Sequence, residues 1–219
     1  MAIRAVLFDI DGTLIDSNYL HVDAWSRAFV DVGHPVDTWK IHRSIGMDGD
    51  KLLDALIEDA DASTRKRATE QHSKHYTTTI DRLRPFHGAR ELLRVLASRD
   101  ITVVLATSAP ERELKTLRSV LSIEDAVAVV TSSEDVTSAK PSPDIVRVAL
   151  DRARVEPPEA IMVGDSVWDM KAAKRAGVTC MGLLSGGIAE GELQAAGAAA
   201  VYRDPADLLE NVRQGLLEH

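Results

Sequence analysis

Two aspartates near the start of the chain, Asp9 and Asp11, have a spacing suited to shared acid chemistry. Asp9 ends an apolar run that begins at Ala5, and Gly12-Thr13 lets the backbone turn just after Asp11. A near-continuous apolar run of this length indicates a parallel strand buried on both faces, and open α/β sheets bind ligands at the carboxyl ends of such strands.

The pair has two interpretations, a plain Asp-Gly turn or a cation site. Two carboxylates beside an apolar run are costly unless a cation or dense hydrogen bonding compensates them, so this setting favours a metal. All-oxygen ligation favours Mg²⁺.

Three more groups of reactive residues stand at predicted strand ends or helix starts. Thr107 and Ser108 follow the strand-like run 101–105, where hydroxyl and N–H groups could hold a phosphate oxygen or merely cap a helix. Lys140 precedes a Pro-Ser-Pro-Asp sequence in a loop, although most lysines are simply solvated. Asp165 and Asp169 follow the run 160–163, four residues apart, and acids near a helix start are also favourable without a metal.

The elements that must position these residues fall into two blocks. Helix signals alone fill residues 17–84: Ser17 is a candidate cap for the first helix, and further helices are predicted over 38–45, from 49 through 57, and over 63–81. From Gly88 helices and strands alternate, with helices at 89–99, 111–121, 142–154 and 168–176 and strands at 101–105, 126–130, 160–163 and 178–183. Ser142 is expected to cap the third of these helices, with Pro143 in its first turn.

The predicted fold is therefore α/β, a Rossmann-like three-layer core with a mostly parallel sheet and an inserted all-helical domain. The core is expected over residues 1–16 and 85–216 and the helical domain over 17–84, while 217–219 have the look of a purification tag remnant. The stretch 195–200, rich in alanine, is too short to assign to a helix or a strand.

Composition narrows the class of protein. The chain has 219 residues, 45% of them hydrophobic, which is enough to bury a real core. A formal net charge of -8 argues against a nucleic-acid partner and means that a phosphate site must carry its own local cations. The single cysteine, the lack of a secretory-type start and the lack of a long apolar stretch predict a cytoplasmic protein without a membrane partner. A monomer is the economical expectation.

Taken together, the strings FDIDGTLID, KPSPD and GDSVWD, with Thr107 between the first two, resemble the four motifs of the haloacid dehalogenase-like (HAD) superfamily of phosphohydrolases. The resemblance spans residues 9 to 169 and lies in the family's order. It implies a Mg²⁺-dependent phosphatase that acts on a small phosphorylated metabolite through an aspartyl-phosphate. An insertion after the first strand resembles the family's small helical cap.

The resemblance also implies a role for each motif residue. Asp9 would be the nucleophile, Asp11 the general acid/base, and Lys140 the group that neutralises the nucleophile and the phosphoryl oxygens. Thr107 would orient the phosphoryl group, with Ser108 beside it. Asp9, the main-chain carbonyl of Asp11 and Asp165 would ligate Mg²⁺, and Asp169 would be a further ligand or support one.

Substrate choice is expected to lie in the helical domain, where His21 and Arg43 are the preferred candidates. The spacing of His21 and Trp25 resembles the cap of the β-phosphoglucomutase and phosphatase subgroup. A phosphosugar mutase is thus the main alternative, but such mutases usually carry an acidic residue where this chain has Gly164. They also carry a cap arginine where it has Asp48-Gly49-Asp50. Asp11 argues against a dehalogenase, and the intact acid pairs with Lys140 argue against an idle binding protein.

Overall fold

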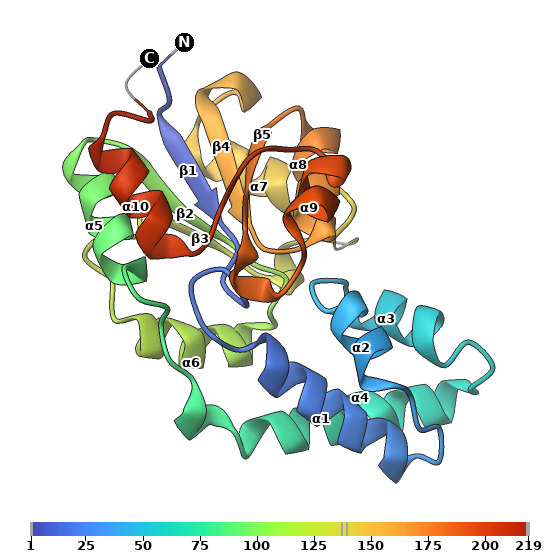
Figure 1. Cartoon of the computed structure of the whole chain (residues 1–219). Coiled ribbons are helices and arrows are strands. Elements are labelled where there is room, and N and C mark those ends of the chain that lie inside the picture. The colour runs from blue at the N-terminus through green and yellow to red at the C-terminus, as the bar shows by residue number, and fades with distance from the viewer. Residues whose placement is uncertain (1, 137, 139, 218–219) are drawn as a thin grey trace. The chain divides into compact units, whose positions relative to one another are not determined.

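The computed structural model describes residues 2–136, 138 and 140–217 of the chain, so Glu218 and His219 of the predicted tag remnant lie outside the described residues. The described chain divides into two compact units (Figure 1). Residues 1–16 and 84–219 form the first unit and residues 17–83 the second. Each helix of the described chain is too short or too polar to cross a lipid bilayer.

The first unit is built on a parallel sheet with the strand order β3-β2-β1-β4-β5-β6. Its strands are β1 (Ala5–Phe8), β2 (Thr102–Ala106), β3 (Val129–Thr131), β4 (Ala160–Gly164), β5 (Thr179–Leu183) and β6 (Ala198–Tyr202). Phe8 lies opposite Leu105 of β2 and Val163 of β4, so these three strands end at the same level. The residues that follow them must therefore meet at one edge of the sheet.

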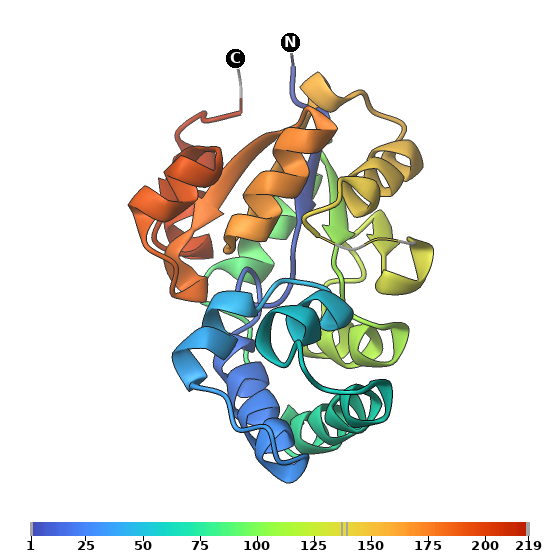
Figure 2. The same ribbon diagram turned by 90° about the vertical axis from the view of Figure 1, so that its right-hand side faces the viewer.

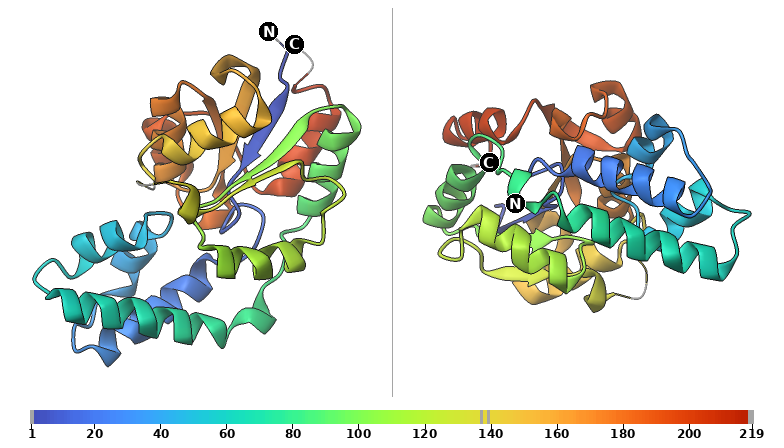
Figure 3. Two further views of the ribbon diagram at one scale, coloured as in Figure 1. Left: turned by 180° about the vertical axis from the view of Figure 1, so that it is seen from behind. Right: turned by 90° about the horizontal axis from the view of Figure 1, so that it is seen from below.

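Helices cover both faces of this sheet, as the buried β1 run predicts. They are α5 (Ala89–Ser98), α6 (Glu111–Leu121), α7 (Asp144–Ala153), α8 (Val167–Ala176), α9 (Glu190–Ala196) and α10 (Pro205–Arg213). Ala5 and Leu7 pack into a core with α7 and α8, which lie in front of the sheet in Figure 2. Val6 and Phe8 face α5 and α10, seen on the opposite side of the sheet in the left view of Figure 3. The three-layer α/β prediction is confirmed.

The second unit is entirely helical. It contains α1 (Asn18–Asp31), α2 (Thr38–Ser44), α3 (Gly49–Leu56), α4 (Ala62–Thr77) and the short 3₁₀ helix η1 (Ile80–Arg82). Its core is formed by buried side chains of α1, α2, α3 and α4, among them Phe29, Ile41, Leu53 and Ala68. Because it has its own hydrophobic core, this unit is a compact body rather than a long loop.

Some predicted details were wrong. The third strand is Val129–Thr131 rather than 126–130, because residues 123–127 form a turn after α6. Pro143, not Ser142, is the N-cap of α7. Ser17 is the N-cap residue of α1 as predicted, although its side chain makes no capping hydrogen bond. Three further elements, α9, β6 and α10, were not predicted. Strand β6 begins with three alanines, which have no β-propensity, so only its pairing with β5 makes it a strand.

Candidate active site

Asp9 stands one residue beyond the end of β1, between β2 and β4 in the sheet. Its backbone N–H donates to the carbonyl of Val163 at 3.0 Å, which extends the strand pairing and fixes the direction of the side chain. Only 6% of the residue is exposed. A carboxylate this deeply buried needs partners, and the structure provides them.

The main partner of Asp9 is Lys140, which is 1% exposed. The Lys140 Nζ donates to Asp9 Oδ1 at 2.6 Å and lies 2.7 Å from Asp169 Oδ1. Burial opposes its charge, but Asp169 and Asp9 outweigh burial and raise the pKa of the ammonium group. Lys140 is therefore a fixed positive charge, and the solvated-lysine interpretation is excluded.

Burial is the dominant influence on Asp9. It raises the pKa of this carboxyl to about 7, against the lowering effect of Lys140, and the like charges of Asp169 and Asp11 raise it further. The three carboxyl groups of Asp9, Asp11 and Asp169 around the single ammonium group of Lys140 leave an excess of negative charge. A further cation would relieve that excess and lower the pKa of Asp9.

Asp165 and Asp169 follow β4 through a turn that also caps a helix. Ser166 is the N-cap of α8: its hydroxyl accepts from the Asp169 N–H, and Asp169 Oδ2 accepts from the Ser166 N–H at 3.1 Å and its hydroxyl at 2.6 Å. This reciprocal capping box fixes Asp169 with its other oxygen on Lys140. Asp169 therefore both caps a helix and belongs to the site.

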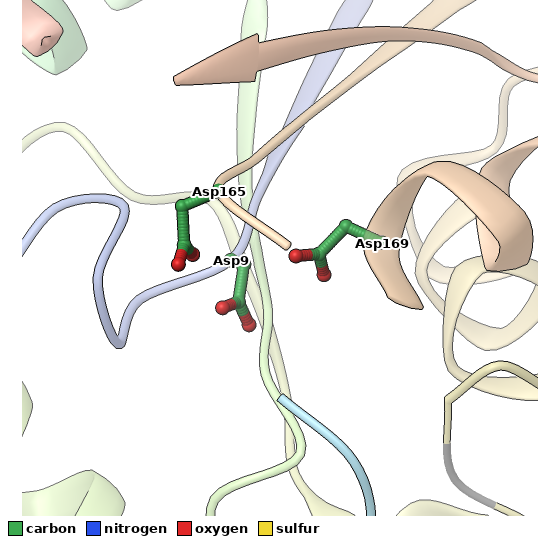
Figure 4. Close-up of side chains that lie close together, drawn as sticks. All are labelled: Asp9, Asp165 and Asp169. Carbon is green, nitrogen blue, oxygen red and sulfur yellow. The ribbon is translucent and has the colours of Figure 1, made fainter. Parts of the chain in front are cut away.

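The Asp9, Asp165 and Asp169 side chains gather at one place (Figure 4). One oxygen from each lies within 4.8 Å of the others, and all three residues are buried. We call these three residues with Lys140 the carboxylate cluster. Its oxygen-only donors and excess negative charge fit a hard divalent cation.

Asp11 and Thr13 lie in the turn after β1. Asp11 is half-buried and close enough to raise the pKa of Asp9, but among the described residues it is not grouped with the three clustered carboxylates. The Thr13 hydroxyl donates to Asp165 Oδ1 at 2.7 Å, and Thr13 is fully buried. From its sequence position, Thr13 is expected only to form part of a turn. The signal that could have identified it is a hydroxyl directly after Asp-x-Asp-Gly.

Thr107 and Ser108 follow β2 at the same edge of the sheet. The Thr107 hydroxyl accepts from the Ala109 N–H at 3.0 Å and retains its own proton for donation. Neither residue caps α6, whose N-cap is Pro110. The Ser108 Oγ atom is buried and has no hydrogen-bond partner among the described residues, so it also has a proton to donate.

His21 and Arg43 belong to the helical unit, on α1 and α2. Arg43 is exposed. His21 is half-buried and stacks on Tyr76 with ring centroids 4.0 Å apart, and its Nδ1 lies 3.2 Å from the Nε2 of His72. His21 thus has an evident packing role, whatever else it contacts.

Comparisons with known proteins agree with this architecture. The sequence model of the haloacid dehalogenase-like hydrolases matches residues 6–183. The chain is 32% identical to a phosphorylated carbohydrates phosphatase of Thermotoga maritima, over 97% of this chain and all of that protein. It is also 32% identical to a phosphoglycolate phosphatase of Rhodospirillum rubrum, over 94% of this chain and 89% of that one.

A solved structure is similar as well. A hydrolase from Pseudomonas syringae superimposes with a TM-score of 0.91 at 35% identity, covering 96% of this chain and 98% of that one. The chain belongs to the haloacid dehalogenase-like hydrolase family, and within it to the phosphatases, which hydrolyse phosphoric monoesters.

Proposed function

We propose that this phosphatase is Mg²⁺-dependent and hydrolyses a small phosphorylated metabolite through a phosphoryl group held on Asp9. The observation that carries the proposal is the buried Asp9 carboxylate, bonded to Lys140 at 2.6 Å and grouped with Asp165 and Asp169 at the carboxyl edge of the sheet. Asp9, Asp165 and the main-chain carbonyl of Asp11 are the proposed ligands, with Asp169 as a further ligand or support. When bound, Mg²⁺ would supply positive charge for the phosphoryl oxygens.

Asp9 is the proposed nucleophile. An oxygen of its carboxylate attacks phosphorus, a new P–O bond to Asp9 forms, and the ester P–O bond on the opposite side breaks. Lys140 neutralises charge on Asp9 and the phosphoryl oxygens without gaining or losing a proton, consistent with its raised pKa. Thr107 and Ser108 are proposed to donate their hydroxyl protons to the same oxygens.

Asp11 is the proposed acid and base. It gives a proton to the departing alkoxide, which leaves as an alcohol. The resulting Asp11 carboxylate then takes a proton from water, whose oxygen attacks phosphorus and breaks the bond to Asp9. Orthophosphate leaves and both aspartates return to their starting states.

The helical unit is the proposed cap that selects the substrate, with His21 and Arg43 as candidate contacts. Phosphoglycolate-like and sugar-phosphate-like esters are the proposed substrates, supported by the names of the two relatives above. We further propose that the enzyme is a cytoplasmic monomer. Light scattering of the purified protein tests the oligomeric state.

A phosphosugar mutase is the alternative, and Gly164 weighs against it. A Cβ atom at this position would lie 2.5 Å from both Cβ and Cγ of Asp169. Asp169 thus fills the space that an acidic side chain at position 164 would need. The family resemblance implies that mutases carry an acidic residue at this position. The packing at Gly164 therefore favours a hydrolase over a mutase.

The test is phosphate release from a panel of small phosphate esters, with Mg²⁺ or with a chelator. The panel includes phosphoglycolate, several sugar phosphates and β-glucose 1-phosphate with a glucose 6-phosphate readout. We expect orthophosphate release that requires the metal, and acid quenching should trap phosphate on the wild-type chain but not on Asp9→Asn. Glucose 6-phosphate without orthophosphate would make the enzyme a mutase, and release unaffected by the chelator would refute the metal requirement.

A further inference from the structure

Gly186 lies against the side chain of Asp165. It ends the short 3₁₀ helix η4 (Leu184–Gly186), which follows β5, the neighbour of β4 in the sheet. A Cβ atom at Gly186 would overlap Asp165 Oδ2 and lie 2.6 Å from Asp165 Cγ. Its φ lies outside the left-handed region, so the backbone would accept alanine there. The close approach to Asp165, and not the backbone conformation, is therefore what requires a glycine at this position.

The other oxygen of Asp165 is held by a hydrogen bond. Thr13 donates its hydroxyl to Asp165 Oδ1 at 2.7 Å, and both residues are buried. The two supporting turns are themselves joined, since the Ser185 hydroxyl donates to the Gly12 carbonyl at 2.6 Å. Turns after β1 and β5 therefore enclose a carboxylate that follows β4, the strand between them.

We propose that Gly186 and Thr13 are positioning residues that together fix the Asp165 carboxylate as a ligand for the divalent cation. The inference rests on the metal site of the proposed function. A carboxylate that is already immobilised loses little further freedom when a cation binds. Groups that orient metal ligands typically contribute about 10-fold to 100-fold in metal affinity.

Two other glycines provide matched controls. A Cβ at Gly182, in β5, would press on the Leu193 side chain at 3.0 Å, so Gly182→Ala crowds the apolar core without touching a carboxylate. A Cβ at Gly191, in α9, would have no atom within 4 Å. The two controls separate general crowding from displacement of Asp165.

The experiment measures equilibrium binding of Mn²⁺ by electron paramagnetic resonance and of Mg²⁺ by calorimetry, without substrate. We expect Gly186→Ala to weaken binding at least 10-fold, while Gly182→Ala and Gly191→Ala stay within about twofold of wild type. Thr13→Val should weaken binding similarly and Thr13→Ser should restore it, because serine keeps the hydroxyl. This rescue would not occur if Thr13 served only to fill space.

A second measurement covers the case in which Gly186→Ala folds poorly. If the alanine side chain displaces the Asp165 carboxylate, Gly186→Ala should lower the melting temperature of the wild-type chain in metal-free buffer. It should not lower the melting temperature of an Asp165→Gly chain, which lacks that carboxylate. Equal losses in both backgrounds would overturn the inference, as would unchanged metal affinity in Gly186→Ala and Thr13→Val. A wild-type chain that binds neither cation would instead overturn the metal site of the proposed function.

Discussion

The two units each bury a group of polar side chains, and they stabilise these groups in opposite ways. In the sheet unit, the carboxylate cluster holds a charged Lys140, which bonds to both Asp9 and Asp169. In the helical unit, His72 is 8% exposed and stacks on Trp25 with centroids 4.1 Å apart. Burial lowers the pKa of His72 to about 2, with smaller effects from His21 and His75, so this ring stays neutral.

The difference shows which buried polar group indicates chemistry. We call Trp25, His72, His21 and Tyr76 the aromatic stack, whose rings lie nearly parallel. Within it, His72 avoids the desolvation cost of a buried charge by remaining uncharged. The carboxylate cluster bears that cost and retains an excess of negative charge, which a structural role alone does not explain.

The largest expected effect is on turnover. Asp9→Asn should reduce phosphate release by about 10⁴-fold or more, because an amide cannot act as the nucleophile. The measurement is the steady-state rate on the best ester of the panel. Asp151→Asn, which alters an exposed carboxylate on α7, is the control and should leave the rate unchanged. A folded Asp9→Asn enzyme with near-normal turnover would refute the role of Asp9.

Removing the positive charge of Lys140 should reduce the stability of the fold. Lys140→Met leaves Asp9 and Asp169 buried without their ammonium partner, so we expect a loss of about 3–5 kcal/mol in the free energy of unfolding. Denaturant titration in metal-free buffer measures it. Arg152→Met removes an exposed ion pair with Asp135 and should cost about 1 kcal/mol or less. Similar losses in the two variants would end the distinction between buried and exposed pairs.

The helical unit should respond to acid. The pKa of His72 is below its unfolded value of 6.5, so the unfolded state takes up a proton first and stability falls as pH drops below about 6.5. Between pH 7.5 and 5 this one group should remove about 2 kcal/mol. His72→Phe keeps a stacked ring and should abolish that loss. Amide hydrogen exchange in α4 measures the effect, and an unchanged pH dependence in His72→Phe would contradict it.

The smallest expected effect comes from removing helix caps, and it distinguishes a residue that only caps a helix from one that also contacts the carboxylate cluster. Ser166→Ala and Asp204→Ala each remove the N-cap side chain of a helix, α8 and α10 respectively, so each should cost about 1 kcal/mol in thermal unfolding. Only Ser166 also bonds to Asp169, so only Ser166→Ala should change the Mg²⁺ concentration needed for half-maximal activity. An equal change in both variants would mean that general stability sets this concentration.

Much of the sheet unit could be predicted because its signals are local. The apolar run ending at Asp9 has the length and character of a buried strand, and β1 is Ala5–Phe8. Helix α6 occupies the predicted residues 111–121. Strand β6 could not be predicted, since its three alanines carry no strand signal and only its pairing with β5 makes it a strand. Local propensity is outweighed there by pairing.

The members of the carboxylate cluster were candidates from the sequence, but the contacts that support it were not. Their positions beside predicted strands and helix starts identified Asp9, Lys140, Asp165 and Asp169, and their roles are proposals. The contacts of Thr13 and Gly186 with Asp165 could not be predicted, because they join turns that follow three different strands. Such contacts depend on strand order, which a single sequence does not specify.

The sequence by itself determined most of the elements up to β5, their α/β alternation, the helical insertion and the family, since each depends on residues close together in the chain or on short motifs. Only the tertiary structure decided that Lys140 bridges Asp9 and Asp169, that Asp169 occupies the space beside Gly164, and that the ring of His72 is kept neutral. These facts depend on burial and on distances between segments far apart in sequence, and both arise only when the sheet and the helices have packed.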